Sequence, residues 1–550
     1  SAARVPFLHN LGPLSPEERE RLLAPDRQTQ AMKVGIVRAI PATVALDALA
    51  GELPGERETS FAGGLLESLS GGDFIWTAGF ASPGAGALRL NLSRLEPSHA
   101  SVYVYSTGGE VHGPYRAAEI GESFWTNTVF DSSIYVEVRF KLGEGERVHL
   151  EVTELLHIEH PEFAPPAEPD VRLSELRDDY PCFTQVPCVP SSEFSPTALA
   201  DRSKAIGQMI YVEGGSSWVC SGGLLNDQDA NTVTPWFLTA NHCIGNQAAA
   251  NTLEIFWDYK RSTCSGAAPS RSSVPRQLGS QLMTTSSHKG GLDVSLLRLN
   301  STPPGSRWYL GWNAQTDLPN TANVRLYRLH HPAGEPMHYQ RQVSLGTLQG
   351  ASPGYVYSRV MYAASAGGSS GSPIFTFDST GGAQVVGSLS GANADTEEDL
   401  KKYCEYDKYL KRDSSFHSSF SLLAPYIASV PSQPQACVQS STTICLVNNR
   451  FSVRVGYNTG DGPKTMTAIK YTPNSGLFWF VGDDNIEILL KMIDACSFNQ
   501  RFWVFVGGTT NVEVTVNVTD TKNGTVKTYV NPLQTDFKTI TDTSAFATCP

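Results

Sequence analysis

The chain has 550 residues, of which 40% are hydrophobic and 17% charged, and its formal net charge is −12. This composition is typical of a globular protein with two to four domains. The negative charge argues against non-specific binding to nucleic acid or to an anionic membrane, and without any run of 18 apolar residues no membrane-spanning helix is expected.

The first part of the chain, residues 1–177, is predicted to be β-rich. It begins with a capping-box pattern at Ser15, which predicts a short helix. Stretches with alternating apolar residues follow at 86–92, 101–106 and 133–140 and predict strands. Residues 160–181, which are rich in proline and acidic residues, then read as an exposed linker.

The middle part, residues 178–430, has short apolar runs and many glycines, and it ends in a helix-like stretch at 421–427. A second linker is predicted at 429–436. The last part, residues 437–550, alternates apolar and polar residues in stretches such as 501–506, which favours a β-sandwich.

Cysteine usage follows the same division. Ten cysteines are present, and none precedes residue 182. Their even number, their long spacings and the absence of a C-x-x-C pair favour disulfides over a zinc or thioredoxin-type site, so we expect a secreted protein. The last four can pair in three ways; they are Cys437, Cys445, Cys496 and Cys549.

A loop with clustered serines, "AASAGGSSGSPIF" at 363–375, carries the first candidate for catalysis. Ser369 fits the G-x-S-x-G elbow of α/β-hydrolases, but that motif needs a helix directly afterwards and a histidine later in the chain. Here Pro373 and a strand-like stretch follow, and only His417 lies downstream. The string also resembles the G-D-S-G-G-P loop of chymotrypsin-like proteases, which selects Ser370 instead.

Partners for that serine precede it. A serine hydroxyl needs a histidine base, and the histidine needs a carboxylate to fix its tautomer. His242 follows a strand-like stretch, and Asp293 stands at the head of another. The order His242, Asp293, Ser370 is that of chymotrypsin-like proteases, so we predict that these residues form a catalytic triad.

The middle part resembles the bacterial lysyl endopeptidases, which are secreted serine proteases. The resemblance covers about 182–428 and implies a mainly β fold, in which a chymotrypsin-like double β-barrel is flanked by an N-terminal β-rich pro-domain and a C-terminal β-sandwich. It implies hydrolysis of peptide bonds without a cofactor or a metal. The matching segments are "FLTANHC" (237–243), "FWDYKRSTC" (256–264), "LHHPAGE" (329–335), "GGSSGSPIF" (367–375) and "VVGSLSGA" (385–392).

The resemblance further implies an oxyanion hole made by the backbone N–H groups of Gly368 and Ser370, since a glycine permits the required turn. It also implies three disulfides. The last of them would clamp the strand that carries His242. The implied pairs are Cys182–Cys404, Cys188–Cys264 and Cys220–Cys243.

Asp413 matches the family's pocket aspartate, because it stands nine residues after Cys404. Ser390 and Gly391 are implied as further substrate-binding residues. We therefore expect cleavage after Lys or Arg, but the choice between them stays open, because Ser390 stands where the family has a histidine. The alternative is a solvated Asp413 neutralised by Arg412.

Control of activity is expected to come from residues 1–177. Trypsin-like enzymes are activated by pairing a new N-terminus with an aspartate, but the corresponding residue here is Ser369. We therefore predict a pro-region that covers the cleft, assists folding and is removed by self-cleavage after Arg172 or, preferably, Arg177. The alternatives are a permanent accessory domain and, for the whole protein, a catalytically silent adhesin on a protease scaffold.

Two other features receive structural interpretations. His330 and His331 resemble a metal-binding pair, but no H-E-x-x-H motif exists and Pro332 would stop a helix, so no metal site is predicted. The aromatic stretches 476–481 and 501–506 could stack on sugars, but alternating aromatic residues in strands more often form the core.

Overall fold

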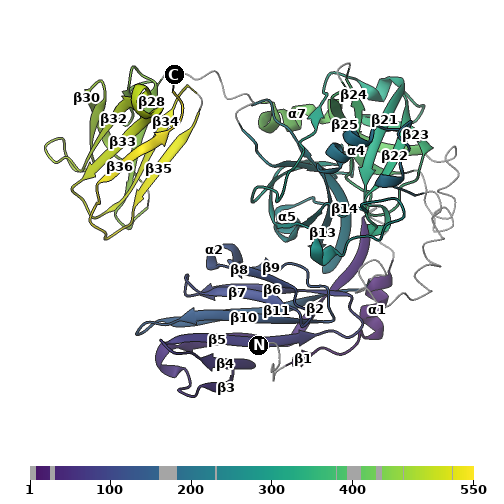
Figure 1. Ribbon diagram of the computed structural model, residues 1–550, viewed down its shortest axis with the longest axis horizontal. Coiled ribbons are helices and arrows are strands. Elements are labelled where there is room, and N and C mark those ends of the chain that lie inside the picture. The colour runs from purple at the N-terminus through teal and green to yellow at the C-terminus, as the bar shows by residue number, and fades with distance from the viewer. Residues whose placement is uncertain are drawn as a thin grey trace. The chain divides into compact units, whose positions relative to one another are not determined.

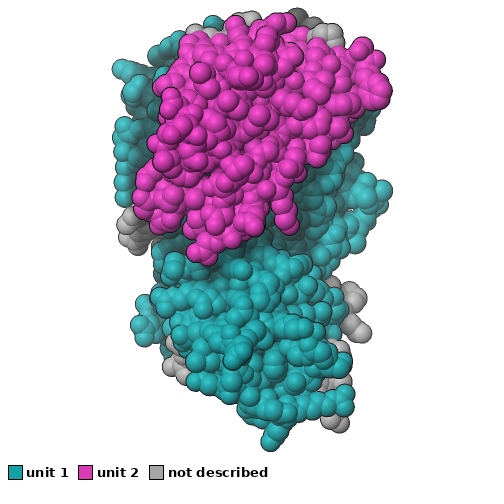
Figure 2. All heavy atoms as spheres, turned by 90° about the vertical axis from the view of Figure 1, so that its left-hand side faces the viewer, with its two compact units in different colours: residues 1–227, 233–427 teal, residues 228–232, 428–550 magenta. Residues whose placement is uncertain are grey.

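The computed structural model contains two compact units (Figure 1). Unit 1 comprises Ser1–Asp227 and Val233–Ile427, and unit 2 comprises Gln228–Thr232 and Ala428–Pro550; Figure 2 colours them separately. The residues that the structure describes are 8–24, 31–159, 183–229, 232–378, 381–392, 410–428, 437–462, 464–522 and 524–549.

The first part of unit 1 consists of two sheets around one apolar core. Along β10 every second side chain is buried, as the alternation of its sequence predicts. The strands expected at 86–92, 101–106 and 133–140 are confirmed as β6, β7 and β10, and Ser15 caps α1. The bounds are β1 (Leu8–Asn10), α1 (Pro16–Leu23), β2 (Met32–Leu49), β3 (Glu58–Phe61), β4 (Gly64–Ser68), β5 (Asp73–Ala81), β6 (Ala87–Glu96), β7 (Ser101–Tyr105), β8 (Val111–Tyr115), α2 (Ala117–Ile120), β9 (Phe124–Trp125), β10 (Ser133–Lys141) and β11 (Arg147–Ile158).

The rest of unit 1 is a double β-barrel. In the first barrel the strands pair in the order β17-β16-β13-β14-β15-β19-β18. Two helices, α4 (Pro196–Ser203) and α5 (Gln247–Thr252), accompany it. The strand bounds are β13 (Ile206–Glu213), β14 (Ser216–Leu225), β15 (Trp236–Thr239), β16 (Glu254–Trp257), β17 (Arg276–Leu278), β18 (Ser280–Ser286) and β19 (Val294–Leu299).

The second barrel is a closed ring. Its strands pair in the order β22-β21-β24-β25-β26-β23, and β23 pairs back to β22. Among the described residues, the short strands β12 and β20 pair at the border of this ring, with β22 and β25 respectively. The bounds are β12 (Thr184–Gln185), β20 (Gly311–Trp312), β21 (Ala322–His330), β22 (His338–Leu345), β23 (Tyr355–Tyr362), β24 (Pro373–Phe377), β25 (Ala383–Ala392) and β26 (Leu410–Ser415).

The helix expected at 421–427 begins earlier than predicted, since α7 spans Phe416–Ile427. Phe416, Leu423 and Ile427 are buried and lie on one face of the helix because their spacing follows the helical period. The first turns contain polar serines, so the apolar spacing in the sequence does not reveal them as helix.

The sheet of the first barrel continues into the N-terminal part of the chain. β2 pairs with β14 on one side and with β11 on the other, as Figure 1 shows near the centre of unit 1. A shared apolar cluster reinforces this junction, with Val34 and Trp125 from one side packed with Val219 and Phe256 from the other. Residues 31–159 and the double barrel thus have separate main cores, which this shared cluster and a common sheet join.

Unit 2 is a β-sandwich, as predicted. Its sheets, ordered β27-β28-β34-β35 and β30-β31-β32-β33-β36, enclose an apolar core to which both contribute. The bounds are β27 (Ile444–Leu446), β28 (Phe451–Asn458), β29 (Lys464–Thr465), β30 (Thr467–Thr472), β31 (Ser475–Trp479), β32 (Ile488–Ala495), α8 (Cys496–Asn499), β33 (Arg501–Gly508), β34 (Glu513–Asp520), β35 (Val526–Asn531) and β36 (Ile540–Phe546).

Candidate active site

His242 lies in a turn directly after β15. Its neighbour Cys243 forms a disulfide with Cys220 of β14, with the two Cα atoms 6.3 Å apart. This confirms the predicted clamp. The His242 side chain is buried, so its position is fixed by the barrel and not by solvent-exposed loops.

Asp293 stands at the head of β19 and binds His242 twice. Oδ1 accepts from the backbone N–H of His242 at 3.0 Å, and Oδ2 lies 2.9 Å from its Nδ1. Asp293 has a φ of +49°, a left-handed conformation that is uncommon for non-glycine residues but in which aspartate is enriched. The carboxylate thus fixes both the backbone and the ring of the histidine.

The carboxyl group of Asp293 is held in its charged form. Burial alone would raise its pKa, but the charge of His242 and the hydrogen bonds from His242 and Ser390 outweigh burial and lower the pKa below its ordinary value. With Nδ1 bound to Asp293, Nε2 of His242 is the ring atom left for chemistry. Nε2 is buried and makes no hydrogen bond within the described part of the chain.

The loop of Ser370 is anchored on β14. Ser221 donates its backbone N–H to the carbonyl of Ser370 and its hydroxyl to the carbonyl of Gly368, each at 2.8 Å. A Cβ on Gly371 would lie 2.1 Å from Oγ1 of Thr239, the last residue of the strand before His242. Only glycine therefore fits here, and the serine loop packs directly against the histidine strand.

Gly368 has a φ of +88°, as expected for a residue that turns its backbone sharply before the nucleophile. The neighbouring N–H groups of Ser369 and Gly371 bond to the carbonyls of Ala366 and Leu389. The assignment of the oxyanion hole to Gly368 and Ser370 remains a prediction.

The hydroxyls of Ser369 and Ser372 bond to groups other than His242. The Ser369 hydroxyl lies 2.7 Å from Nδ1 of His330, whose pKa burial lowers well below its ordinary value. The Ser372 hydroxyl donates to the carbonyl of Ser369 and accepts from Arg328. Both serines hold the loop in place, which leaves Ser370 as the candidate nucleophile.

The environment of Asp413 differs from the one predicted. Asp413 and Arg328 are both fully buried, and the guanidinium donates to Oδ1 of Asp413 at 2.5 Å. Burial raises the pKa of Asp413 and the charge of Arg328 opposes that rise. The carboxylate is therefore not solvated. The chain supplies a cation to Oδ1, while Oδ2 is buried and makes no hydrogen bond among the described residues.

Lys411, on the same strand, adds a second buried basic group near Asp413. Burial lowers the pKa of Lys411 to about 7. The predicted neutralising residue, Arg412, instead lies over the ring of Tyr355, with its guanidinium carbon 5.0 Å from the ring centroid. Arg328 lies on β21, far from Asp413 in the chain, so the spacing of residues in the sequence does not reveal their pairing.

Ser390 contacts the carboxylate of Asp293. Its hydroxyl donates to Oδ2 of Asp293 at 2.5 Å and also accepts from Arg412 at 3.3 Å. The prediction gave Ser390 and its neighbour Gly391 a role in binding substrate. The observed hydrogen bond joins Ser390 to Asp293, a contact that no sequence motif marked, and the role of Ser390 and Gly391 in binding substrate stays a prediction.

The remaining cysteines are paired where the structure describes them. The predicted Cys188–Cys264 disulfide is confirmed, and unit 2 contains Cys437–Cys445 and Cys496–Cys549, one of the three possible connectivities. Cys182 and Cys404 lie outside the described residues.

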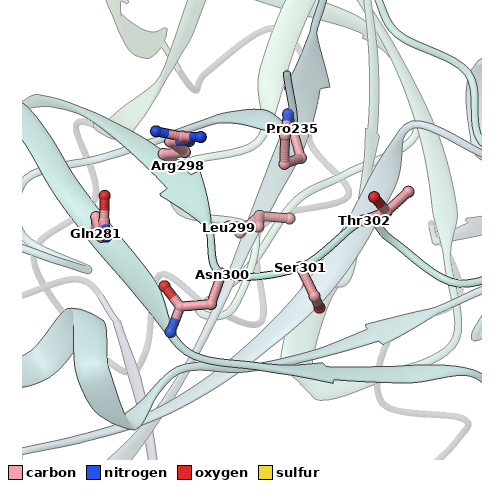
Figure 3. Close-up of a pocket in the computed structure, with 7 residues that line it drawn as sticks. All are labelled: Pro235, Gln281, Arg298, Leu299, Asn300, Ser301 and Thr302. Atoms are coloured by element: carbon pink, nitrogen blue, oxygen red, sulfur yellow. The ribbon is translucent and has the colours of Figure 1, made fainter. Parts of the chain in front are cut away.

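A cavity of about 560 Å³ opens elsewhere on the first barrel (Figure 3). It contains none of the residues of the predicted triad and is not the candidate site. Its lining residues are Pro235, Gln281, Arg298, Leu299, Asn300, Ser301 and Thr302. Among the helices that the structure describes, none is long and apolar enough to cross a membrane.

Comparison with known proteins gives matches to proteases. Residues 178–410 match the family model "Lysyl endopeptidase, C-terminal domain". Lysyl endopeptidase of Pseudomonas aeruginosa is 28% identical over 256 residues, which cover 44% of this chain and 51% of that protein. The chain thus spans about half the length of this curated relative.

Solved structures of serine proteases also align with the chain. The thermostable serine protease AL20 from an extremophilic microorganism is 14% identical, covers 41% of this chain and 98% of its own, and gives a TM-score of 0.29. Protease Anisep from Arthrobacter nicotinovorans is 16% identical, with coverages of 42% and 98% and a TM-score of 0.30.

The fold and the family match concern the same residues. The closed second barrel and the first barrel with its His242–Asp293 pair lie within or directly beside residues 178–410. The resemblance stated from the sequence is therefore confirmed: residues 178–410 match the lysyl endopeptidase family model, and this part of the chain folds as a double β-barrel.

Proposed function

We propose that the protein is a serine endopeptidase that uses Ser370, His242 and Asp293. The observation that carries the proposal is the buried His242–Asp293 pair, whose geometry leaves Nε2 of His242 as the available base. In this reaction, Ser370 Oγ attacks the peptide carbonyl while His242 takes its proton, and the imidazolium then protonates the leaving amine. Asp293 stabilises the imidazolium throughout.

The N–H groups of Gly368 and Ser370 are proposed to stabilise the oxyanion. The positive φ of Gly368 supports this role because it permits the required turn of the backbone. Loss of one such donor typically slows the reaction by ~10²–10³-fold.

The finer proposal is cleavage after Lys or Arg, and the similarity to Lysyl endopeptidase of P. aeruginosa supports it. The ion pair of Asp413 with Arg328, with Lys411 nearby, argues against Asp413 as the acid that selects a basic side chain. A peptide library, read at the residue before the cleaved bond, tests this. A basic preference that survives Asp413→Asn would place its origin elsewhere in the pocket.

We further propose that residues 1–177 are a pro-region, that 178–430 form the protease domain of a secreted precursor, and that 437–550 are an extension. The disulfides support an oxidising location. The separate core of the first part supports its identity as a distinct domain. The proposed processing sites at Arg172 and Arg177 lie outside the described residues, and N-terminal sequencing of the secreted protein tests them.

The experiment that tests the catalytic proposal is labelling with a fluorophosphonate, which reacts only with an activated serine. The expected result is a single covalent adduct on Ser370 in the processed protein. A catalytically silent adhesin would stay unlabelled, and so would the His242→Ala variant that serves as a control.

A further inference from the structure

We propose that the N-terminal domain blocks the part of the cleft that receives the leaving-group half of a peptide substrate, by adding β2 to the edge of β14 beside the nucleophile. This inference rests on the proposed function as a serine endopeptidase. It assigns the inhibitory contact to a specific strand and a specific half of the cleft.

Both edges of β14 have backbone partners. One edge pairs with β13 along Ser216–Gly223. All other backbone partners of β14 therefore lie on its opposite edge. Along that edge, β2 pairs with Ser216–Val219 and β15 pairs with Gly223–Leu225. Between them, the carbonyl of Ser370 accepts from the backbone N–H of Ser221. Along this edge β2 is thus the direct neighbour of the nucleophile loop.

The pairing of β2 with β14 lies close to the proposed catalytic groups. Met32, near the start of β2, is opposite Val219. A Cγ atom of Val219 lies 3.5 Å from the position that a Cβ on Gly368 would take. The next residue, Cys220, is bonded to Cys243 beside His242. Met32 is therefore opposite a residue of β14 that packs beside Gly368 and directly precedes the cysteine bonded next to His242.

The chemistry of the proposed reaction places the substrate on the same side. His242 protonates the leaving amine, so the substrate chain after the cleaved bond must lie on the His242 side of the nucleophile. Peptides commonly bind proteases and other proteins by adding a strand to a free sheet edge. Without β2, residues 216–219 of β14 would be such an edge, next to the disulfide that holds His242. β2 takes the place of the substrate strand there.

The rest of the domain is anchored independently of this end of β2. Buried Glu254 of β16 accepts hydrogen bonds from the backbone and hydroxyl of Thr128 and from the side chain of Asn127. Arg276 of β17 pairs with Glu110. A local change in β2 should therefore open the edge without releasing the domain.

Lys33 is the residue to change. It is opposite Trp218, and its Nζ lies 5.3 Å from the centroid of the Trp218 ring. Lys33→Pro removes a backbone donor and disfavours the extended pairing. The matched control is Asp47→Asn near the far end of the same strand, where Asp47 forms a partly exposed ion pair with Arg147 and lies 3.5 Å from Nδ1 of His149.

The experiment uses the intact full-length chain, verified by mass before and after each assay. One substrate is an ester that ends at the cleaved bond. The other is a quenched fluorescent peptide with the same residues before that bond and three residues after it. The processed protein cleaves both. We expect the intact chain to cleave the ester at a similar kcat/KM but the peptide about 100-fold more slowly.

In the intact chain, Lys33→Pro should raise kcat/KM for the peptide about tenfold, and Asp47→Asn should leave it unchanged. Equal cleavage of the peptide by intact and processed protein would overturn the inference. It would also be overturned if the intact chain cleaved neither substrate and the fluorophosphonate labelled only the processed form. Absence of labelling in every form would instead contradict the proposed function.

Discussion

At the scale of single residues, the choice between adjacent serines is the sharpest test of the site. Ser370→Ala and His242→Ala should lower kcat by about 10⁴–10⁶-fold, as loss of a triad member does in serine proteases. Ser369→Ala should keep most of kcat, because that hydroxyl contacts His330 and not His242. Steady-state kinetics on one peptide substrate compares the three variants, and an inactive Ser369→Ala beside an active Ser370→Ala would reverse the assignment.

Ser390 should act through Asp293 and not through substrate. Removing its hydroxyl in Ser390→Ala deletes one hydrogen bond to Oδ2 and should lower kcat about tenfold while KM stays unchanged. Separate measurement of kcat and KM distinguishes the two roles. A raised KM with unchanged kcat would return Ser390 to the substrate-binding residues.

Arg328 and Asp413 should behave as a structural ion pair. Arg328→Met would leave a buried carboxylate without its cation and should destabilise the barrel by about 3–5 kcal/mol. The double variant Arg328→Met/Asp413→Leu should recover much of this loss, since it leaves no unpaired charge. Thermal unfolding of the variants checks the prediction. Equal melting temperatures for the wild type and Arg328→Met would show that the pair contributes nothing.

At the scale of elements, β16 joins the N-terminal domain to the first barrel through a titratable group. Burial would raise the pKa of Glu254, but the charges of Arg276 and Arg89 and the hydrogen bonds from Thr128 and Asn127 lower it below 4.5. A carboxyl with a lowered pKa in the folded state stabilises that state fully above pH 4.5 and loses this contribution as the pH falls through the folded-state value.

Glu254→Gln should therefore lower the melting temperature of the intact chain at pH 6, and the difference from the wild type should shrink as the pH falls from 4.5 toward 3. Glu144→Gln, at an exposed glutamate, serves as the control and should track the wild type throughout. A difference that is constant with pH would show that Glu254 contributes through its shape and not through its charge.

The same scale shows what the sequence could predict. Strands with strict alternation, such as β10, and the serine and histidine motifs were recognised because the signal is local. The pair of Arg328 with Asp413 and the pairing of β2 with β14 were not, because each joins segments that are distant in the chain. Residue spacing alone cannot show which buried charge meets which, and it suggested a free carboxylate at Asp413 where the fold supplies a cation.

At the scale of the whole molecule, a common sheet unites the N-terminal domain with the barrel that carries His242 and Asp293. Removal of that domain would expose the edge of β14 beside the nucleophile. Processing after Arg177 should therefore increase peptide cleavage. N-terminal sequencing together with an activity assay checks this, and full activity of a chain that still begins at Ser1 would contradict it.

The most direct measurement for the whole account is the site of covalent labelling by a fluorophosphonate, mapped by mass spectrometry on the processed protein. We predict one adduct, on Ser370, that disappears in His242→Ala and persists in Ser369→Ala. An adduct on Ser369, or no adduct on a correctly folded chain with its disulfides intact, would contradict it.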